Sequence, residues 1–217
     1  RGGFQHFYSS CTQEFFITSL YKPYKPYYAS NLRCICRFRC DLAKLARKSA
    51  NKSANMAEAS DGRVVLLSWN VASWPTTLAL IQQHYGSLAA YLDRHAVDVL
   101  CLQETKLETS RVANARESGA LEPGWSSFWA CNDGGGSSKR GFNGCATFAR
   151  SGLVISASSD VFEDEELDKE GRCVVTEVAA MPRNVVIFNV YAPLSSWQYT
   201  RIPYKMRSVS YTHLRAH

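Results

Sequence analysis

The sequence has 217 residues, of which 46% are hydrophobic and 20% are charged, a composition typical of one globular domain with a sizeable core. It contains no run of 18 apolar residues, so it predicts no transmembrane helix, and it shows no signal-peptide pattern. The net charge of +6 is uneven, because residues 1–55 carry 10 Lys or Arg against 2 Asp or Glu, whereas residues 56–217 carry 15 against 17. A nucleic-acid contact in the later part would therefore depend on a local patch of positive charge.

Residues 1–55 differ in kind from the rest of the chain. They contain Lys-Pro repeats, tyrosine clusters and a basic run, and no helical or strand period persists through them. We predict a disordered leader over 1–55, with Met56 as the biological start. The alternative is an organelle transit peptide, since the segment is basic, contains serines and is poor in acidic residues.

A strand–helix–strand unit is predicted next. Residues 64–70 and 97–102 are short apolar runs rich in β-branched residues, and both predict buried strands. Between them, apolar residues at spacings of 3 and 4 mark one face of an amphipathic helix: Leu78, Ile81, Tyr85, Leu88 and Leu92. Gly86 interrupts this helix, so two shorter helices are the alternative. The order predicts a βαβ unit with two parallel strands.

The remaining elements are predicted to be one helical stretch and two hairpins. Residues 104–117 are polar and predict a helical stretch. Strands over 125–131 and 145–150 flank a Gly-rich loop and predict a hairpin. Strands over 173–179 and 185–191 predict a second one. Cys101 and Cys173 lie inside apolar runs, as buried free thiols do.

Polar side chains follow the two strands of the predicted βαβ unit. Asn70 ends the first strand and Glu104 follows the second. Ligands of open α/β sheets bind at the carboxyl ends of the strands, and amide and carboxylate oxygens suit a hard cation such as Mg²⁺. This pair is a candidate metal site if the two strands are neighbours, although a polar residue at a strand end also serves as a cap or turn residue.

Five sequence words give the pattern a more specific meaning. In chain order they are LSWN at 67–70, CLQETK at 101–106, GFNGCATF at 141–148, LDKEGR at 167–172 and FNVYAP at 188–193. The series resembles the exonuclease III / apurinic-apyrimidinic endonuclease family of the endonuclease/exonuclease/phosphatase superfamily, and most of all its second eukaryotic type. The resemblance covers residues 63–207 and is expected to stop near Arg207.

The resemblance implies a fold, an activity and a partner. The fold would be α/β: the N-terminal half of a four-layer α/β/β/α sandwich with mixed sheets. The activity would be cleavage of DNA on the 5′ side of abasic sites and removal of 3′ blocking groups or nucleotides, with Mg²⁺ as cofactor and Mn²⁺ as a possible substitute. The partner would be DNA with abasic sites or blocked 3′ ends, and the location nuclear or, alternatively, mitochondrial. Nothing in the sequence indicates a membrane or an oligomer.

The resemblance also implies roles for single residues. Glu104 would be the principal Mg²⁺ ligand, with Asn70 beside the metal. Tyr191 would contact the phosphate and stabilise developing charge, and Lys106 would support the metal-site carboxylates. The remaining DNA contacts would come from the neck of the Gly-rich loop, at Gly141 and Phe142.

The sequence departs from the family pattern at several points. Ala72 and Leu194 stand where relatives carry polar side chains, and the words Gly-Asp-x-Asn and Asp-His do not occur. We therefore expect a domain over 56–207 that is truncated, followed by a non-family tail over 208–217. Such a half domain would leave an apolar sheet face without a partner and would be inactive and poorly soluble. The alternative function is a catalytically dead nucleic-acid-binding or interaction module.

Overall fold

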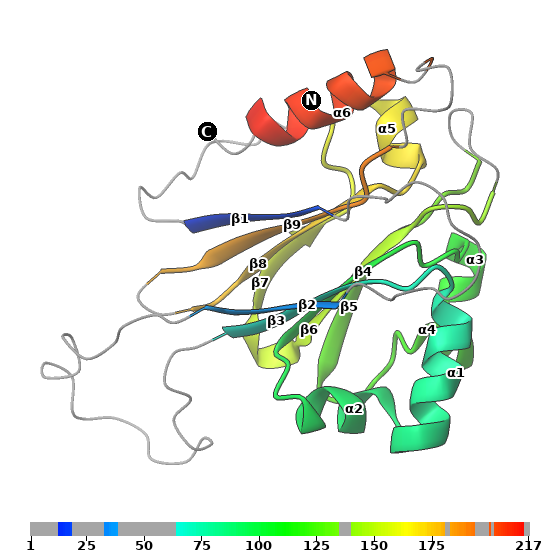
Figure 1. Cartoon of the computed structure of the whole chain (residues 1–217), viewed down its shortest axis with the longest axis vertical. Helices are drawn as coiled ribbons and strands as arrows, with labels where there is room; N and C mark the ends of the chain where they lie inside the picture. The colour runs from blue at the N-terminus through cyan, green and yellow to red at the C-terminus, as the bar shows by residue number, and fades with distance from the viewer. Residues whose placement is uncertain are drawn as a thin grey trace, which may run out of the picture.

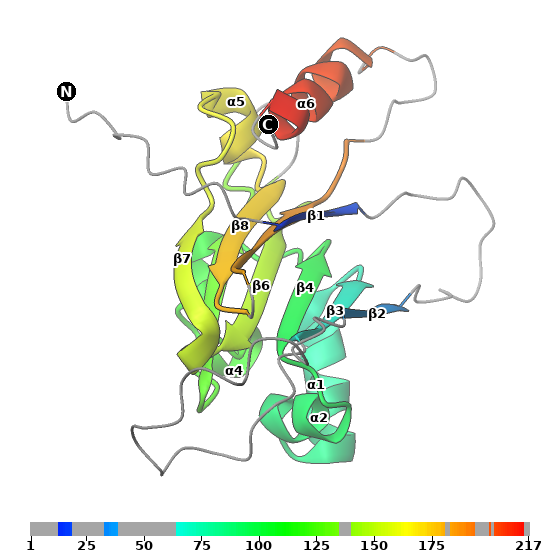
Figure 2. The same ribbon diagram turned by 90° about the vertical axis from the view of Figure 1, so that its left-hand side faces the viewer.

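Two β-sheets stack face to face, and helices cover both outer faces (Figure 1). The structure is a computed structural model that describes residues 13–18, 33–38, 64–134, 140–180, 183–193, 200 and 202–214. The layers follow the order helix, sheet, sheet, helix, and in the view turned by 90° the helices again lie above and below the strands (Figure 2). This arrangement confirms the predicted α/β/β/α sandwich with mixed sheets.

The first sheet has five strands in the spatial order β2-β3-β4-β6-β5. Its strands are β2 (Arg33–Phe38), β3 (Val64–Asn70), β4 (Val99–Gln103), β5 (Trp125–Ala130) and β6 (Cys145–Arg150). β3 and β4 run parallel, while β6 pairs antiparallel with β4 and with β5. The predicted βαβ unit and the predicted β5–β6 hairpin are both confirmed.

The crossover of the βαβ unit consists of two helices, α1 (Trp74–Tyr85) and α2 (Leu88–Arg94). Gly86 ends α1 with a φ of +84° and donates its N–H to Gln82 O, a backbone conformation that favours glycine. Ser87 then caps α2 by accepting a hydrogen bond from Ala90 N. The alternative of two shorter helices is therefore confirmed, and their apolar face packs on the outer face of the first sheet.

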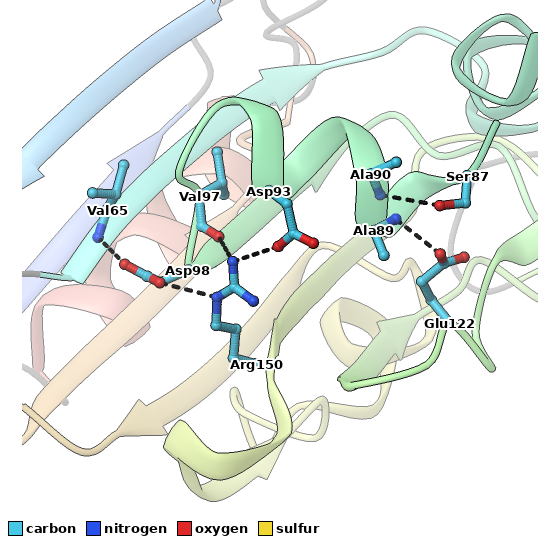
Figure 3. A network of polar contacts seen from close by, with 9 residues as sticks. All are labelled: Val65, Ser87, Ala89, Ala90, Asp93, Val97, Asp98, Glu122 and Arg150. Atoms are coloured by element: carbon cyan, nitrogen blue, oxygen red, sulfur yellow. Dashed lines mark hydrogen bonds and ion pairs between the residues drawn. The ribbon is translucent and has the colours of Figure 1, made fainter. Parts of the chain in front are cut away.

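A polar network holds the end of the first sheet at which β3 and β4 begin (Figure 3). Asp98 accepts hydrogen bonds from Val65 N at 2.8 Å and from Arg150 Nε at 3.1 Å. Arg150 also contacts Asp93, at 2.7 Å. The network connects β6, β4, β3 and the end of α2. The residues that follow β3 and β4 lie at the opposite end of the sheet.

The second sheet has four strands in the order β1-β9-β8-β7. The remaining elements are β1 (Gln13–Thr18), β7 (Val154–Ser158), β8 (Cys173–Val178), β9 (Val185–Val190), the 3₁₀ turn η1 (Ser151–Leu153), α3 (Thr109–Val112), α4 (Ala115–Ser118), α5 (Glu165–Lys169) and α6 (Ile202–Leu214). The predicted β8–β9 hairpin is confirmed, whereas β7 was not predicted. No helix among the described residues is long and apolar enough to cross a membrane.

The predicted helical stretch over 104–117 is wrong in its extent. Only α3 and α4 are helical there. Glu104 and Lys106 have φ values of +56° and +54°, which no right-handed helix accommodates. Asn114 then separates the two short helices, because its side chain accepts a hydrogen bond from Arg116 N and so caps α4.

The inner faces of the two sheets pack against each other. Leu66, Val99 and Ala149 of the first sheet share a buried cluster with Val178 and Ile187 of the second. The expectation of an apolar sheet face without a partner is therefore wrong for this interface. The first sheet has a partner because β7, β8 and β9 already form most of the second sheet. The outer face of the second sheet is covered in turn by apolar residues of and around α5.

Two strands come from the segment that was predicted to be without regular structure. β1 pairs parallel with β9, and β2 pairs antiparallel with β3. Both extend an edge of a sheet whose backbone groups are otherwise open to pairing. The sequence pattern did not predict these two strands, while the interpretation of 1–55 as a leader or transit segment stays a prediction.

Candidate active site

The two predicted metal-site residues lie side by side at one rim of the first sheet. β3 and β4 are adjacent and parallel, with Asn70 in register with Gln103, so the residues that end them meet at the same edge. Asn70 Nδ2 donates a hydrogen bond of 2.8 Å to Glu104 Oε1. Asn70 Oδ1 in turn accepts a hydrogen bond from Ala72 N at 3.2 Å, so both ends of the carboxamide are held in place.

Glu104 reaches Asn70 because the backbone leaves the strand conformation at this point. Side chains alternate between faces along β4, so Gln103 faces the inner layer and a continued strand would turn Glu104 outward. The left-handed backbone at Glu104, with φ of +56°, breaks that alternation. Its carboxylate is consequently kept at the rim and is largely buried.

Backbone strain is concentrated at this rim. Within the described residues, positive φ values occur at six non-glycine residues. Four of them lie here: Ala72, Glu104, Lys106 and Asn143. A left-handed conformation of a non-glycine residue costs about 1–2 kcal/mol, and such residues cluster where a site requires a particular geometry. This clustering marks the rim as the strongest candidate for an active site.

The loop after β4 is fixed by hydrogen bonds from both sides. Trp74 N donates to Thr105 O at 2.9 Å, which ties the loop to the start of α1, and Thr105 N donates to Gly144 O at 3.1 Å. Lys106 N donates to Asn143 O at 2.9 Å. Gly144 has a φ of +86°, and a Cβ there would clash with the Thr105 hydroxyl. The position of Glu104 therefore depends on the backbone that precedes β6.

The predicted DNA-contacting residues lie next to the metal-site pair. Lys106 Nζ is 3.8 Å from Glu104 Oε2 and 5.9 Å from the centre of the Phe142 ring. Phe142 is 55% exposed, and Gly141 N donates to Asn132 O at 2.9 Å. A cation and an exposed aromatic ring thus flank the carboxylate, while residues 135–139 of the Gly-rich loop lie outside the described residues.

Tyr191 approaches the same rim from the second sheet. Its N–H donates to Arg172 O at 2.9 Å, and that carbonyl also accepts a contact of 3.3 Å from Cys145 Sγ. Cys145 is the register partner of Gln103, the residue before Glu104. The structure therefore brings Tyr191 to the end of the sandwich that carries Asn70 and Glu104. Leu194, the departure that follows Tyr191-Ala192-Pro193, lies outside the described residues.

The EGR word has a structural role that sequence reasoning missed. Arg172 and Glu170 form an ion pair of 2.5 Å, and both side chains are buried. Arg172 Nη1 also donates to Tyr191 O at 3.2 Å, and its guanidinium lies 5.4 Å from the centre of the Tyr191 ring. The signal was an acidic and a basic residue two positions apart, directly before the apolar strand that begins at Cys173, and it was used only as a family signature.

Sequence reasoning also missed two buried amides, Gln103 and Asn189. Both are fully buried, and they form a hydrogen bond of 2.7 Å between the sheets. Each is a polar residue near the end of an apolar strand, a pattern that demands a partner because a buried amide without one costs free energy.

Three buried cysteines of the described residues offer no ligand to the candidate site. Cys101, Cys145 and Cys173 are buried free thiols, as predicted for the first and third. Burial raises the pKa of Cys101 to about 12 and raises the pKa of Cys145 and of Cys173 as well. These thiols stay protonated at neutral pH and offer no thiolate ligand to a metal.

Comparison with known proteins identifies the family. The sequence profile of the Endonuclease/Exonuclease/phosphatase family matches residues 67–213. This chain belongs to that family. The match confirms the predicted resemblance, and it extends beyond Arg207, where the resemblance was expected to stop.

Individual relatives are similar over part of their length. An exodeoxyribonuclease of Bacillus subtilis is 31% identical over 144 residues, which cover 65% of this chain and 48% of the relative. A bovine DNA-(apurinic or apyrimidinic site) endonuclease 2 is 26% identical over 186 residues, which cover 70% and 35%. The crystal structure of the Xenopus laevis APE2 catalytic domain superposes with a TM-score of 0.50 at 25% identity and covers 68% of this chain and 51% of that one. The chain thus spans about half or less of the length of these relatives.

Proposed function

We propose that this chain is part of a DNA-repair nuclease that cleaves phosphodiester bonds 5′ to abasic sites and removes 3′ blocking groups or nucleotides. The observation that carries the proposal is the hydrogen bond between Asn70 and Glu104, with a left-handed backbone at Glu104, at the end of a sandwich of the Endonuclease/Exonuclease/phosphatase family. The names of the relatives, an exodeoxyribonuclease and an apurinic or apyrimidinic site endonuclease, support the reaction and the DNA substrate.

The residues present fit a magnesium ion. Glu104 and Asn70 offer hard oxygen donors, and Mg²⁺ in proteins is commonly held by one or two carboxylates with water and substrate phosphate in the remaining positions. Within the described part of the chain, no group of three or more His, Cys, Asp or Glu side chains could hold a metal ion, which favours this open kind of site over an all-protein cage. Mn²⁺ would serve as an alternative. A bound divalent cation would offset the negative charge that builds up on the attacked phosphate.

The other rim residues have separate tasks in this proposal. Lys106 offsets charge beside Glu104 and, with the exposed ring of Phe142, provides a surface for the DNA backbone close to Gly141. Tyr191 would donate its hydroxyl to the phosphate oxygens, because aimed donors stabilise charge that develops in the transition state. Asn70 orients the Glu104 carboxylate through its amide N–H.

A catalytically dead nucleic-acid-binding module is the second candidate. The observation that favours it is Ala72, whose backbone is held by Asn70 but whose methyl side chain offers no ligand to a metal or its water. The sequence also contains no Gly-Asp-x-Asn and no Asp-His word. For this reason we propose that the chain by itself turns over DNA slowly or not at all, even where it binds the metal.

Metal binding by the full chain tests the proposal first. Titration with Mn²⁺, followed by electron paramagnetic resonance of the free ion, should show one site that Glu104→Gln weakens on the order of tenfold or more, since it removes the anionic ligand. The matched control is Glu165→Gln, an exposed acid on α5 that should leave the affinity unchanged. Equal affinity in the wild type and in Glu104→Gln would remove Glu104 from the metal site and contradict the proposal.

A cleavage assay separates the two candidates. Because the chain by itself is expected to turn over slowly at most, duplex DNA with one abasic site is incubated for hours with a molar excess of the chain and Mg²⁺. Slow cutting on the 5′ side that stops when the metal is chelated would support the nuclease. Metal-independent binding of this duplex without any cleavage would favour the dead module.

We also propose a nuclear location, with the mitochondrion as the alternative. The reason is the DNA substrate together with the basic composition of residues 1–55. Imaging of fluorescent fusions with and without residues 1–55 tests this proposal: a nuclear signal of the full chain would support it, whereas a mitochondrial signal that is lost when residues 1–55 are removed would favour the transit segment.

A further inference from the structure

A set of buried amides and one hydroxyl joins the two sheets directly behind the candidate active site. Gln103 Nε2 donates to Asn189 Oδ1 at 2.7 Å across the interface and to Ser68 Oγ at 3.2 Å within the first sheet. Asn189 Nδ2 donates to Leu102 O at 3.2 Å and Ala146 O at 2.9 Å. Gln103, Asn189 and Ser68 are all buried, and we call these three residues the inter-sheet clasp.

The hydrogen bonds fix the orientation of both amides. Asn189 Nδ2 donates to two carbonyl oxygens, so Asn189 must present its Oδ1 to Gln103. Gln103 must therefore donate from its NH₂ group, whose nitrogen is also 3.5 Å from Cys101 O. Gln103 Oε1 accepts no hydrogen bond from the described residues, so the donors alone determine how this side chain lies.

Each clasp residue is close in the sequence to a candidate catalytic residue at or just after the end of its strand. Gln103 directly precedes Glu104. Ser68 and Asn70 are two apart, as are Asn189 and Tyr191. Since side chains two apart on a strand share a face, Asn70 continues the inward-facing row that carries Ser68. Tyr191, the residue after β9, packs against the buried cluster of Cys145 and Val174 between the sheets. The clasp therefore connects β3, β4 and β9 close to the positions at which Asn70, Glu104 and Tyr191 reach the rim.

We infer that the inter-sheet clasp positions the three candidate catalytic residues Asn70, Glu104 and Tyr191 relative to one another. Apart from the clasp and the contact of Cys145 Sγ with Arg172 O, the described residues of the two sheets meet here through apolar contacts, which have no direction and tolerate sliding. Hydrogen bonds between buried amides define both distance and orientation. The role of the clasp at a metal and phosphate site rests on the proposed function, whereas the coupling between the sheets does not.

The test replaces both partners of the bond between the sheets with apolar residues of similar size. Gln103→Met and Asn189→Leu should each lower the midpoint of urea unfolding, because each removes the hydrogen bond between the two buried amides and leaves the remaining amide one partner short. The double variant should recover the part of that loss that comes from this bond, since neither amide is then left without the other. Ile187→Val is the control, because Ile187 is buried in the same inter-sheet layer but is not part of the clasp.

Hydrogen exchange then separates positioning from stability. The amides of Thr105, Lys106 and Tyr191 are each hydrogen-bonded at the rim, so their exchange rates report on both sides of the interface. In the double variant, whose stability is partly restored, all three should exchange faster, on the order of tenfold, which corresponds to about 1.4 kcal/mol. The control should exchange like the wild type. Wild-type exchange at the three amides, or a change confined to one sheet, would overturn the inference.

Mn²⁺ affinity, measured on the same samples, keeps the two proposals apart. If Glu104 binds the ion, the double variant should lose Mn²⁺ affinity several-fold, whereas Ile187→Val should keep it. An unchanged Mn²⁺ affinity of the double variant would overturn the clasp as a positioning device. Where Glu104→Gln binds Mn²⁺ as well as the wild type does, the proposed function fails, and the exchange rates alone decide the clasp.

Discussion

Arg172 shows how a single buried charge ties stability to the geometry of the rim. Its guanidinium is paired with Glu170 in the protein interior and also donates to the backbone carbonyl of Tyr191. A buried ion pair contributes little net stability compared with apolar residues, but removal of one partner leaves an uncompensated charge. Arg172 is therefore expected to affect folding and the position of Tyr191 together.

The variant Arg172→Met should lower the free energy of unfolding by about 3–5 kcal/mol, because it removes the guanidinium that is paired with the buried Glu170 carboxylate. Urea unfolding monitored by circular dichroism measures the change. The control is Lys169→Met, which removes a comparable pair with Glu165 on the protein surface and should cause no measurable change. Equal effects of the two variants would show that Glu170 does not depend on Arg172.

At the scale of elements, the loop after β4 is specified by its neighbour. Glu104 and Lys106 adopt left-handed backbone because the chain before β6 and the start of α1 hydrogen-bond to the residues around them. Glutamate and lysine have no local preference for left-handed backbone, so the tertiary contacts determine the conformation of both residues. Gly144 is the residue on which this arrangement depends most, since its φ is positive and any Cβ would clash with Thr105.

The variant Gly144→Ala should destabilise the protein by about 1–3 kcal/mol more than Gly86→Ala does, because overpacking is added to backbone strain. Gly86 is a matched control, since its φ of +84° is close to the +86° of Gly144 and a Cβ at Gly86 would meet no atom within 4 Å. Both variants share the strain of a left-handed alanine. Chemical unfolding of the two proteins gives the difference, and equal losses would show that Thr105 moves aside at little cost.

At the scale of the whole molecule, the two sheets form one interior. Ile187 and Val178 of the second sheet are buried against residues of the first, and the clasp adds polar contacts across the same interface. Four tryptophans belong to the first sheet or the helix beside it: Trp69, Trp74, Trp125 and Trp129. Tryptophan fluorescence therefore reports largely on one side of the sandwich.

The variant Ile187→Ala should lower the free energy of unfolding by about 2–5 kcal/mol. Tryptophan fluorescence should report this loss although the substitution lies in the other sheet. The reason is that a shared core makes the two sheets unfold together. Leu121→Ala is the control, because Leu121 is 77% exposed and should leave the transition in place. A shift seen by circular dichroism but absent from fluorescence would indicate that the sheets unfold separately.

Much of the fold could be predicted because local patterns carry it. The apolar runs of β3 and β4, the helical stripe broken at Gly86 and both hairpins follow from periodicity and turn residues. The edge strands β1 and β2 were missed because they depend on pairing with a neighbour more than on their own pattern. β7 was missed for the same reason, since its residues are mostly exposed and show no apolar alternation.

The sequence by itself determined the family, the order of its elements and the identity of the residues at the strand ends, because these are properties of residue type and spacing. Only the tertiary structure decided that Asn70 and Glu104 touch, since that contact requires parallel neighbouring strands and a left-handed backbone at Glu104. It also decided that Gln103 and Asn189 bind each other across two sheets. A bond between residues 86 positions apart leaves no local trace in the chain, because it is formed only when both sheets are packed.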